Sequence, residues 1–174
     1  MIAPNQLESL YREHCAAVIR AAYRVTGNVA DAEDVLQTVF LRLARREEDE
    51  AFLKNAGAYL HRAAVNCAID MLRSRQSARS TPIDDVAGVL AADSSLSPDR
   101  AHRSVEIRAW VRRAIATLSP KTAEIFTLRY LDGFGNSEIA EMLDTSPTTV
   151  AVTLNRAREK MTKDFKHFMG ESHA

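Results

Sequence analysis

Two polar stripes in the sequence contain the residue types that contact nucleic acid. Along residues 59–75, Arg62, Asn66 and Arg73 fall on one side of a predicted helix, with Ile69 among them. Guanidinium groups bind phosphates, and amides can bond to base edges. The stripe therefore predicts a surface that contacts phosphates and bases, although a solvated helix face would show the same pattern.

The second stripe lies near the C-terminus, in a segment with the spacing of a helix-turn-helix unit. A short helix of about two turns is expected there, with Asn136 or Ser137 as its cap. The buried face of this helix is predicted to comprise Ile139, Ala140 and Leu143. The residues that follow, 144–146, are predicted to form the turn.

The helix after this turn is predicted to carry the DNA-reading residues. Ser146 is the expected cap, and Pro147 takes the first helical position, where its missing N–H costs nothing. The inward stripe is predicted to be Val150, Leu154, Ala157 and Met161. The candidate major-groove readers are Thr148, Thr149, Val152, Asn155 and Arg156. A basic run suited to phosphate contacts overlaps them: Arg156, Arg158, Lys160, Lys163 and Lys166. Two short amphipathic helices also occur in proteins that never touch DNA.

A third segment, from Asp31 to Leu43, is predicted to be an amphipathic helix. Its acidic residues lie in the first turn, where negative charge complements the helix dipole. Its apolar face is predicted to comprise Val35, Leu36, Val39, Phe40 and Leu43. Periodicity alone identifies this segment only as an ordinary helix that faces a core.

The apolar spacing predicts an all-α fold, because no segment alternates convincingly as a strand. We expect two small helical domains joined by a flexible linker. Residues 5–77 form the predicted N-terminal domain, and residues 78–103, which are rich in Ser, Ala and Asp and contain two prolines, form the linker. The helical period resumes at Ser104, and residues 104–169 form the predicted helix-turn-helix domain.

The composition limits the class of protein. The chain has 174 residues, 46% hydrophobic and 26% charged, with a formal net charge of zero. No apolar run approaches the roughly 20 residues of a membrane-spanning helix, and the N-terminus lacks signal-peptide features, so a cytoplasmic location without membrane insertion is expected. Cys15 and Cys67 fit neither a disulfide framework nor a zinc motif. Without the usual catalytic motifs, we expect no enzyme, no catalytic residue, no metal and no cofactor.

Three segments together resemble one family. Residues 31–43 (DAEDVLQTVFLRL), 55–75 (NAGAYLHRAAVNCAIDMLRSR) and 131–158 (LDGFGNSEIAEMLDTSPTTVAVTLNRAR) look like the extracytoplasmic-function sigma factors of bacterial RNA polymerase. They occur in the family's order and spacing and cover most of the chain. The resemblance implies an alternative sigma factor that binds core RNA polymerase, recognises the −10 and −35 promoter elements and promotes melting at −10.

The resemblance also implies residue roles. The helix from Asp31 resembles the one that docks on the β′ clamp helices, which makes these residues candidate polymerase contacts: Asp34, Leu36, Gln37 and Phe40. The candidate −10 contacts are Arg62, Asn66, Arg73 and Arg75, and the helix-turn-helix module resembles the one that reads the −35 element. The acidic linker with Asp84, Asp85 and Asp93 resembles, by position, the segment that threads polymerase. The β flap of polymerase and an anti-sigma factor are the further partners implied.

Some positions depart from the family's pattern. Ala151-Val152-Thr153 stands where Lys-Ser-Arg is common, which predicts weaker phosphate binding. Val65 and Met71 occupy positions where arginine is frequent. Melting at −10 is therefore expected to depend mainly on Arg62, Arg73 and Arg75.

Two other functions remain open from the sequence. A stand-alone helix-turn-helix regulator would hold its operator without polymerase, whereas a sigma factor of this type needs polymerase. A sigma-mimicking adaptor would bind an anti-sigma factor but direct no transcription.

Overall fold

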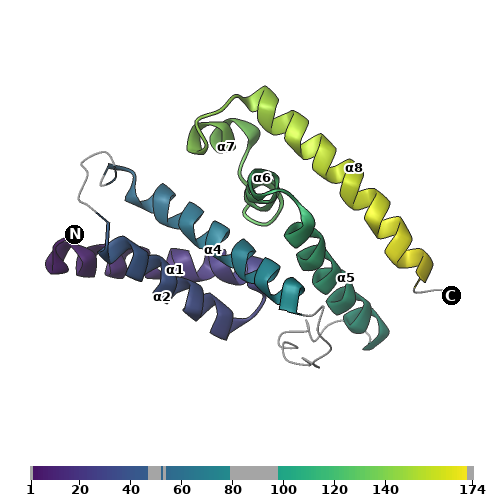
Figure 1. The fold of residues 1–174 in the computed structure, drawn as a ribbon, viewed down its shortest axis with the longest axis horizontal. Helices are drawn as coiled ribbons and strands as arrows, with labels where there is room; N and C mark the ends of the chain where they lie inside the picture. The colour runs from purple at the N-terminus through teal and green to yellow at the C-terminus, as the bar shows by residue number, and fades with distance from the viewer. Residues whose placement is uncertain (1, 47–51, 53, 79–97, 172–174) are drawn as a thin grey trace.

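A computed structural model describes residues 2–46, 52, 54–78 and 98–171, and every regular element in this part of the chain is helical (Figure 1). The predicted all-α fold is therefore confirmed. Most of the expected linker, including Asp84, Asp85 and Asp93, lies outside the described residues.

In the described residues up to Ala78, the N-terminal half contains helices α1 (Pro4–Thr26), α2 (Val29–Ala44) and α4 (Ala56–Ala78). Helix α1 is terminated by its C-terminal cap, Gly27, whose φ of 66° is left-handed and suits glycine. Asn28 then caps α2 by accepting a hydrogen bond from the backbone N–H of Asp31. The three helices pack on one another around a core that includes Val18, Val25, Val35, Leu43, Leu60 and Val65.

Four helices form the C-terminal half: α5 (Pro98–Thr117), α6 (Pro120–Tyr130), α7 (Asn136–Met142) and α8 (Pro147–Glu171). Their core includes Ile115, Ile125, Leu128, Ile139, Val150 and Leu154. Beyond this core, the ring of Trp110 on α5 lies edge-on to that of Phe165 on α8, with centroids 4.9 Å apart. This contact holds the long C-terminal part of α8 alongside α5.

Two boundaries differ from the sequence expectation. Helix α5 begins at Pro98, not at Ser104, where the helical period had been expected to resume. The start of this helix could not be predicted from apolar spacing, because the exposed residues of its first turns are polar: Arg100, His102 and Arg103. Helix α7 is capped by Gly135, so Asn136 is already helical; the Gly135 N–H donates to Glu138 Oε2 at 2.7 Å.

The two halves of the molecule are in contact. Helix α6 lies between α4 and α8, and α4 packs against both α5 and α6 (Figure 1). This packing places the C-terminal half on the face of α4 that carries the polar stripe.

Candidate nucleic-acid interface

The second helix of the predicted helix-turn-helix unit, α8, has the expected two faces. Val150, Leu154, Ala157 and Met161 are all buried, as predicted. The five candidate readers, Thr148, Thr149, Val152, Asn155 and Arg156, are exposed. Ser146 Oγ accepts a hydrogen bond from the backbone N–H of Thr149 at 3.1 Å, which confirms the predicted cap.

The basic run continues this face along α8. Its side chains line one shallow hollow together with Asn155, Glu159 and Thr162. Two contacts hold its first part in place: Arg158 donates to the side-chain oxygen of Asn155, and Lys160 Nζ donates to the carbonyl of Thr117 at 3.1 Å. Arg156 also lines this hollow and is exposed, so it is well placed for phosphate contacts.

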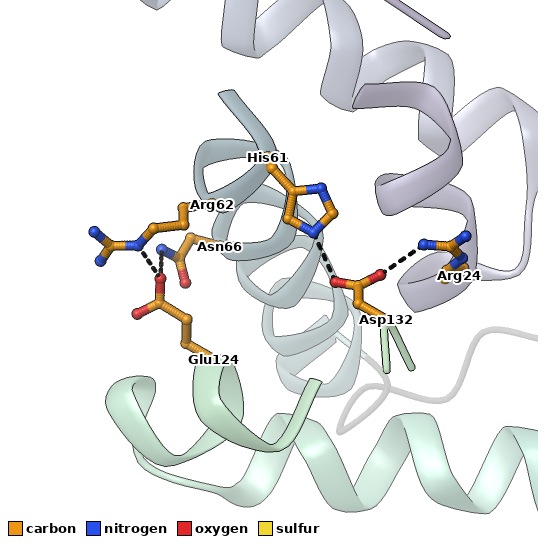
Figure 2. Close-up of polar contacts among 6 residues, drawn as sticks. All are labelled: Arg24, His61, Arg62, Asn66, Glu124 and Asp132. Carbon is orange, nitrogen blue, oxygen red and sulfur yellow. Dashed lines mark hydrogen bonds and ion pairs between the residues drawn. The ribbon is translucent and has the colours of Figure 1, made fainter. Parts of the chain in front are cut away.

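The polar stripe on α4 does align on one face, but that face meets the C-terminal half. Arg62 Nε and Asn66 Nδ2 both donate to one oxygen of Glu124, Oε1, at 2.9 and 3.0 Å (Figure 2). Arg62 also donates to the carbonyl of Met142 at 3.1 Å, and Arg73 donates to that of Leu118 at 2.8 Å. Three of the four candidate −10 residues are thus bonded to groups on or beside α6 and α7.

The fourth candidate, Arg75, lies elsewhere. Its two terminal nitrogens form a bidentate ion pair with Asp31, whose side chain is only 6% exposed. This pair joins the end of α4 to the start of α2. Arg75 therefore has a structural partner within the N-terminal half, which its position in the sequence did not reveal.

The candidate polymerase contacts on α2 divide into two kinds. Asp34 and Gln37 are exposed, whereas Leu36 and Phe40 are buried, at 6% and 7% exposure. The Phe40 ring meets the Tyr11 ring edge-on, with centroids 5.0 Å apart. Leu41, which was not singled out in the sequence, is 60% exposed on the same helix.

A second group of contacts between the halves was missed by sequence reasoning. The Asp132 side chain, 1% exposed, binds Arg24 NH1 at 3.0 Å and His61 Nε2 at 2.8 Å (Figure 2). Arg112 Nε on α5 donates to the carbonyl of Val25 at 3.2 Å. Burial lowers the pKa of the Arg112 guanidinium from its ordinary value, and the nearby charge of Arg108 adds to this effect.

One residue of the sequence points weakly to these contacts. Glu124 is an acid between apolar Ala123 and Ile125 in a short helix, and it is buried at 7% exposure. Buried carboxylates need donors, so such a residue predicts a partner. Nothing in the sequence names that partner as Arg62 and Asn66, 62 and 58 residues away.

An aromatic cluster lies at the start of α4. The Arg46 guanidinium stacks over Tyr59 and Phe52, 4.8 and 5.1 Å from the ring centroids. These residues line a cleft of about 620 Å³ that also borders Arg62, Phe134 and Met142. Aromatic rings beside arginines can stack unpaired bases.

The described part of the chain contains no candidate membrane span and no candidate metal cluster. None of its helices combines the length and the apolar character needed to cross a bilayer. Nor do its His, Cys, Asp and Glu side chains form a group of three or more that could hold a metal ion. Burial raises the pKa of the Cys67 thiol, and Cys67 and Cys15 are both free.

Comparison with known proteins defines the class first. The family described as Sigma-70 region 2 matches residues 10–78, and that described as Sigma-70, region 4 matches residues 108–161. Two regions of the Sigma-70 type, region 2 followed by region 4, therefore account for most of the chain.

The curated relatives narrow the class. The ECF RNA polymerase sigma factor SigL of Mycobacterium tuberculosis is 31% identical over 154 residues, covering 87% of this chain and 84% of its own length. SigW of Bacillus subtilis is 28% identical and covers 86% and 83%. SigE of Mycolicibacterium smegmatis is 30% identical, and the match spans 88% of this chain but only 59% of that protein. The chain belongs to the ECF sigma factor family and is an alternative sigma factor, the class that directs transcription initiation.

A solved structure is also similar. The ECF sigma factor SigJ of M. tuberculosis aligns with 92% of this chain and 53% of its own, at 24% identity and a TM-score of 0.48.

Proposed function

We propose that this sigma factor works in the cytoplasm, binds core RNA polymerase through α2 and directs it to promoters whose −10 and −35 elements are read by α4 and α8. The observation that carries this proposal is the recognition face of α8, where five candidate readers are exposed over a fully buried apolar stripe. Such a helix, capped at Ser146 and lying after a tight turn, suits the major groove. The protein acts by binding, without catalysis, metal or cofactor.

Polymerase docking is assigned to the exposed side of α2. Asp34 and Gln37 supply polar contacts there, and the exposed Leu41 supplies an apolar one. Leu36 and Phe40 support this surface from within the core, with Phe40 held against Tyr11. We therefore expect substitution of Asp34 or Gln37 to weaken polymerase binding more selectively than substitution of Leu36 or Phe40, which would also damage the core.

Recognition and opening of the −10 element are assigned to α4. Arg62 and Arg73 supply charge for the phosphates, Asn66 supplies an amide, and the exposed Tyr59 ring offers a stacking surface for a separated base. Extruding a base costs a few kcal/mol, which capture of the single strand offsets. Arg75 contributes chiefly by holding Asp31. The β flap and an anti-sigma factor are the further partners that this family membership favours.

The decisive experiment is run-off transcription with core polymerase and a library of promoter fragments. An Arg62→Ala/Arg73→Ala variant should initiate more weakly than the wild type, whereas Arg20→Ala, which removes an exposed arginine on α1, should not. Binding to core polymerase with no transcript from any fragment would identify a sigma-mimicking adaptor. Binding to duplex DNA with no affinity for polymerase would identify a stand-alone regulator.

A further inference from the structure

The −10 face of α4 is occupied by the protein itself. The polar groups of Arg62, Asn66 and Arg73 are bonded to Glu124, to the carbonyl of Met142 and to that of Leu118. Ile69, between them on the same face, is 1% exposed. The residues proposed to meet DNA are therefore the residues that hold the two halves together.

We propose that the C-terminal half is a built-in competitor for −10 DNA, with the Glu124 carboxylate occupying the donors that would otherwise bind the promoter strand. This inference rests on the proposed function, because it takes the α4 stripe to be the −10 surface. In the closed arrangement the free protein cannot present that surface. Core polymerase and promoter DNA would then have to separate the halves before α4 can engage the −10 element.

The chemistry of the contact supports competition. A carboxylate oxygen that accepts from both a guanidinium and an amide imitates a phosphate or base oxygen. Because Arg62 is bonded through Nε to Glu124 and through NH1 to the Met142 carbonyl, DNA would have to replace both partners. Helix α6 also packs directly on α4, which excludes a nucleic-acid strand from the same face.

A second group of contacts lies on the other side of α4. We call Glu124 and Asp132, the acidic residues of the two groups, the latch residues. Asp132, in the loop after α6, binds Arg24 on α1 and His61 on α4 (Figure 2). The His61 ring also meets the Phe134 ring edge-on, 5.4 Å between centroids. The Glu124 contacts and the Asp132 contacts flank α4, so together they fix the C-terminal half in one orientation.

The contact has the character of a reversible interface. Most of its named contacts are hydrogen bonds and ion pairs between charged side chains and carbonyls or carboxylates. Interfaces between domains that move relative to one another are typically more polar than permanent ones. Each group lost from the contact can be satisfied by DNA or water when the halves separate, which keeps the cost of opening modest.

The test uses the full-length chain carrying Glu124→Gln and Asp132→Asn, which remove both latch charges at nearly constant side-chain size. A matched control, Glu33→Gln/Asp164→Asn, removes the same two charges from exposed positions outside the contact. Small-angle scattering measures the radius of gyration. Fluorescence anisotropy measures binding, without polymerase, of a single-stranded oligonucleotide that carries the non-template −10 strand of a promoter selected from the run-off library.

We expect the latch variant to have a larger radius of gyration and to bind the oligonucleotide about three- to tenfold more tightly, because a larger fraction of molecules is competent to bind. The control should match the wild type in both measurements. Asp132→Asn alone, in a loop outside the core helices, provides a milder variant should the double one fold poorly, and it should shift both quantities in the same direction.

An unchanged radius and affinity in the latch variants would overturn the inference, and so would an increased radius with no gain in affinity. Run-off transcription with core polymerase separates these results from failure of the proposed function. Wild type and latch variants could transcribe equally while the variants bind the oligonucleotide no more tightly than the wild type. That result would support the sigma assignment and contradict the proposal that the C-terminal half competes with −10 DNA. If no chain supports transcription, the proposed function fails, while the scattering still reports whether the latch charges hold the halves together.

Discussion

Individual arginines on α4 have different partners, and their substitution should have different consequences. Arg62 and Arg73 bind the C-terminal half, whereas Arg75 pairs with Asp31 within the N-terminal half. The three arginines among the candidate −10 residues have the same chemistry at the level of the sequence. The structure separates them by the side chain or carbonyl that each one meets.

Arg75→Ala is expected to destabilise the protein. It leaves the buried Asp31 carboxylate without its guanidinium partner, which costs about 1–3 kcal/mol of the free energy of unfolding. Urea unfolding followed by circular dichroism measures this loss, with Arg20→Ala as the control. A variant that loses −10 binding at unchanged stability would show instead that Arg75 is chiefly a DNA contact.

At the scale of one element, the two faces of α8 are determined by its own sequence. Helix α8 is amphipathic over its first turns, so burial of Val150 and Leu154 fixes which residues face outward. The cap at Ser146 and Pro147 fixes where it begins. The same regular pattern explains why the recognition face was predictable: the period of a capped helix determines both faces at once.

Arg156→Ala is expected to weaken promoter binding nearly equally across sequences, because Arg156 lines the basic hollow and is exposed there, which suits a phosphate contact. The slope of log affinity against log salt should become shallower by about 0.9, the contribution of one phosphate. Titration of labelled promoter DNA with polymerase holoenzyme at several salt concentrations measures it. An unchanged slope combined with an altered preference at one base pair would identify Arg156 as a base reader.

The arrangement of the whole molecule depends on contacts between its halves, and one glycine marks how closely they approach. A Cβ added at Gly27 would lie 1.9 Å from the Arg112 guanidinium of α5. At Gly133, which has a similarly positive φ of 83°, nothing lies within 4 Å of an added Cβ. Substitution at Gly133 should therefore introduce backbone strain alone, whereas substitution at Gly27 should also disturb the contact with Arg112.

Gly27→Ala and Gly133→Ala should both lower the free energy of unfolding, by about 1 kcal/mol, because alanine is strained at positive φ. Only Gly27→Ala should also enlarge the radius of gyration, since it displaces Arg112 from the carbonyl of Val25. Scattering of the two variants decides this. Equal radii in both variants would mean that Arg112 moves aside without loosening the contact between the halves.

The sequence by itself determined the helices and their local faces. The apolar period placed the α8 core stripe, and the Ser-Pro pair placed its start, because both depend on residues within a few turns of each other. The three family-like segments also indicated the class to which the chain belongs. The start of α5 was missed because exposed, polar turns carry no such period.

Only the tertiary structure decided what the polar stripe of α4 meets. Periodicity placed Arg62, Asn66 and Arg73 on one face, yet their partners lie 45–80 residues further along the chain. The periodicity of a helix sequence shows on which face of that helix a side chain lies. The group that the side chain contacts depends on how distant helices pack. Burial of Glu124 and Asp132 against α4 is a property of that packing, and it turns an apparent DNA surface into a contact between the two halves.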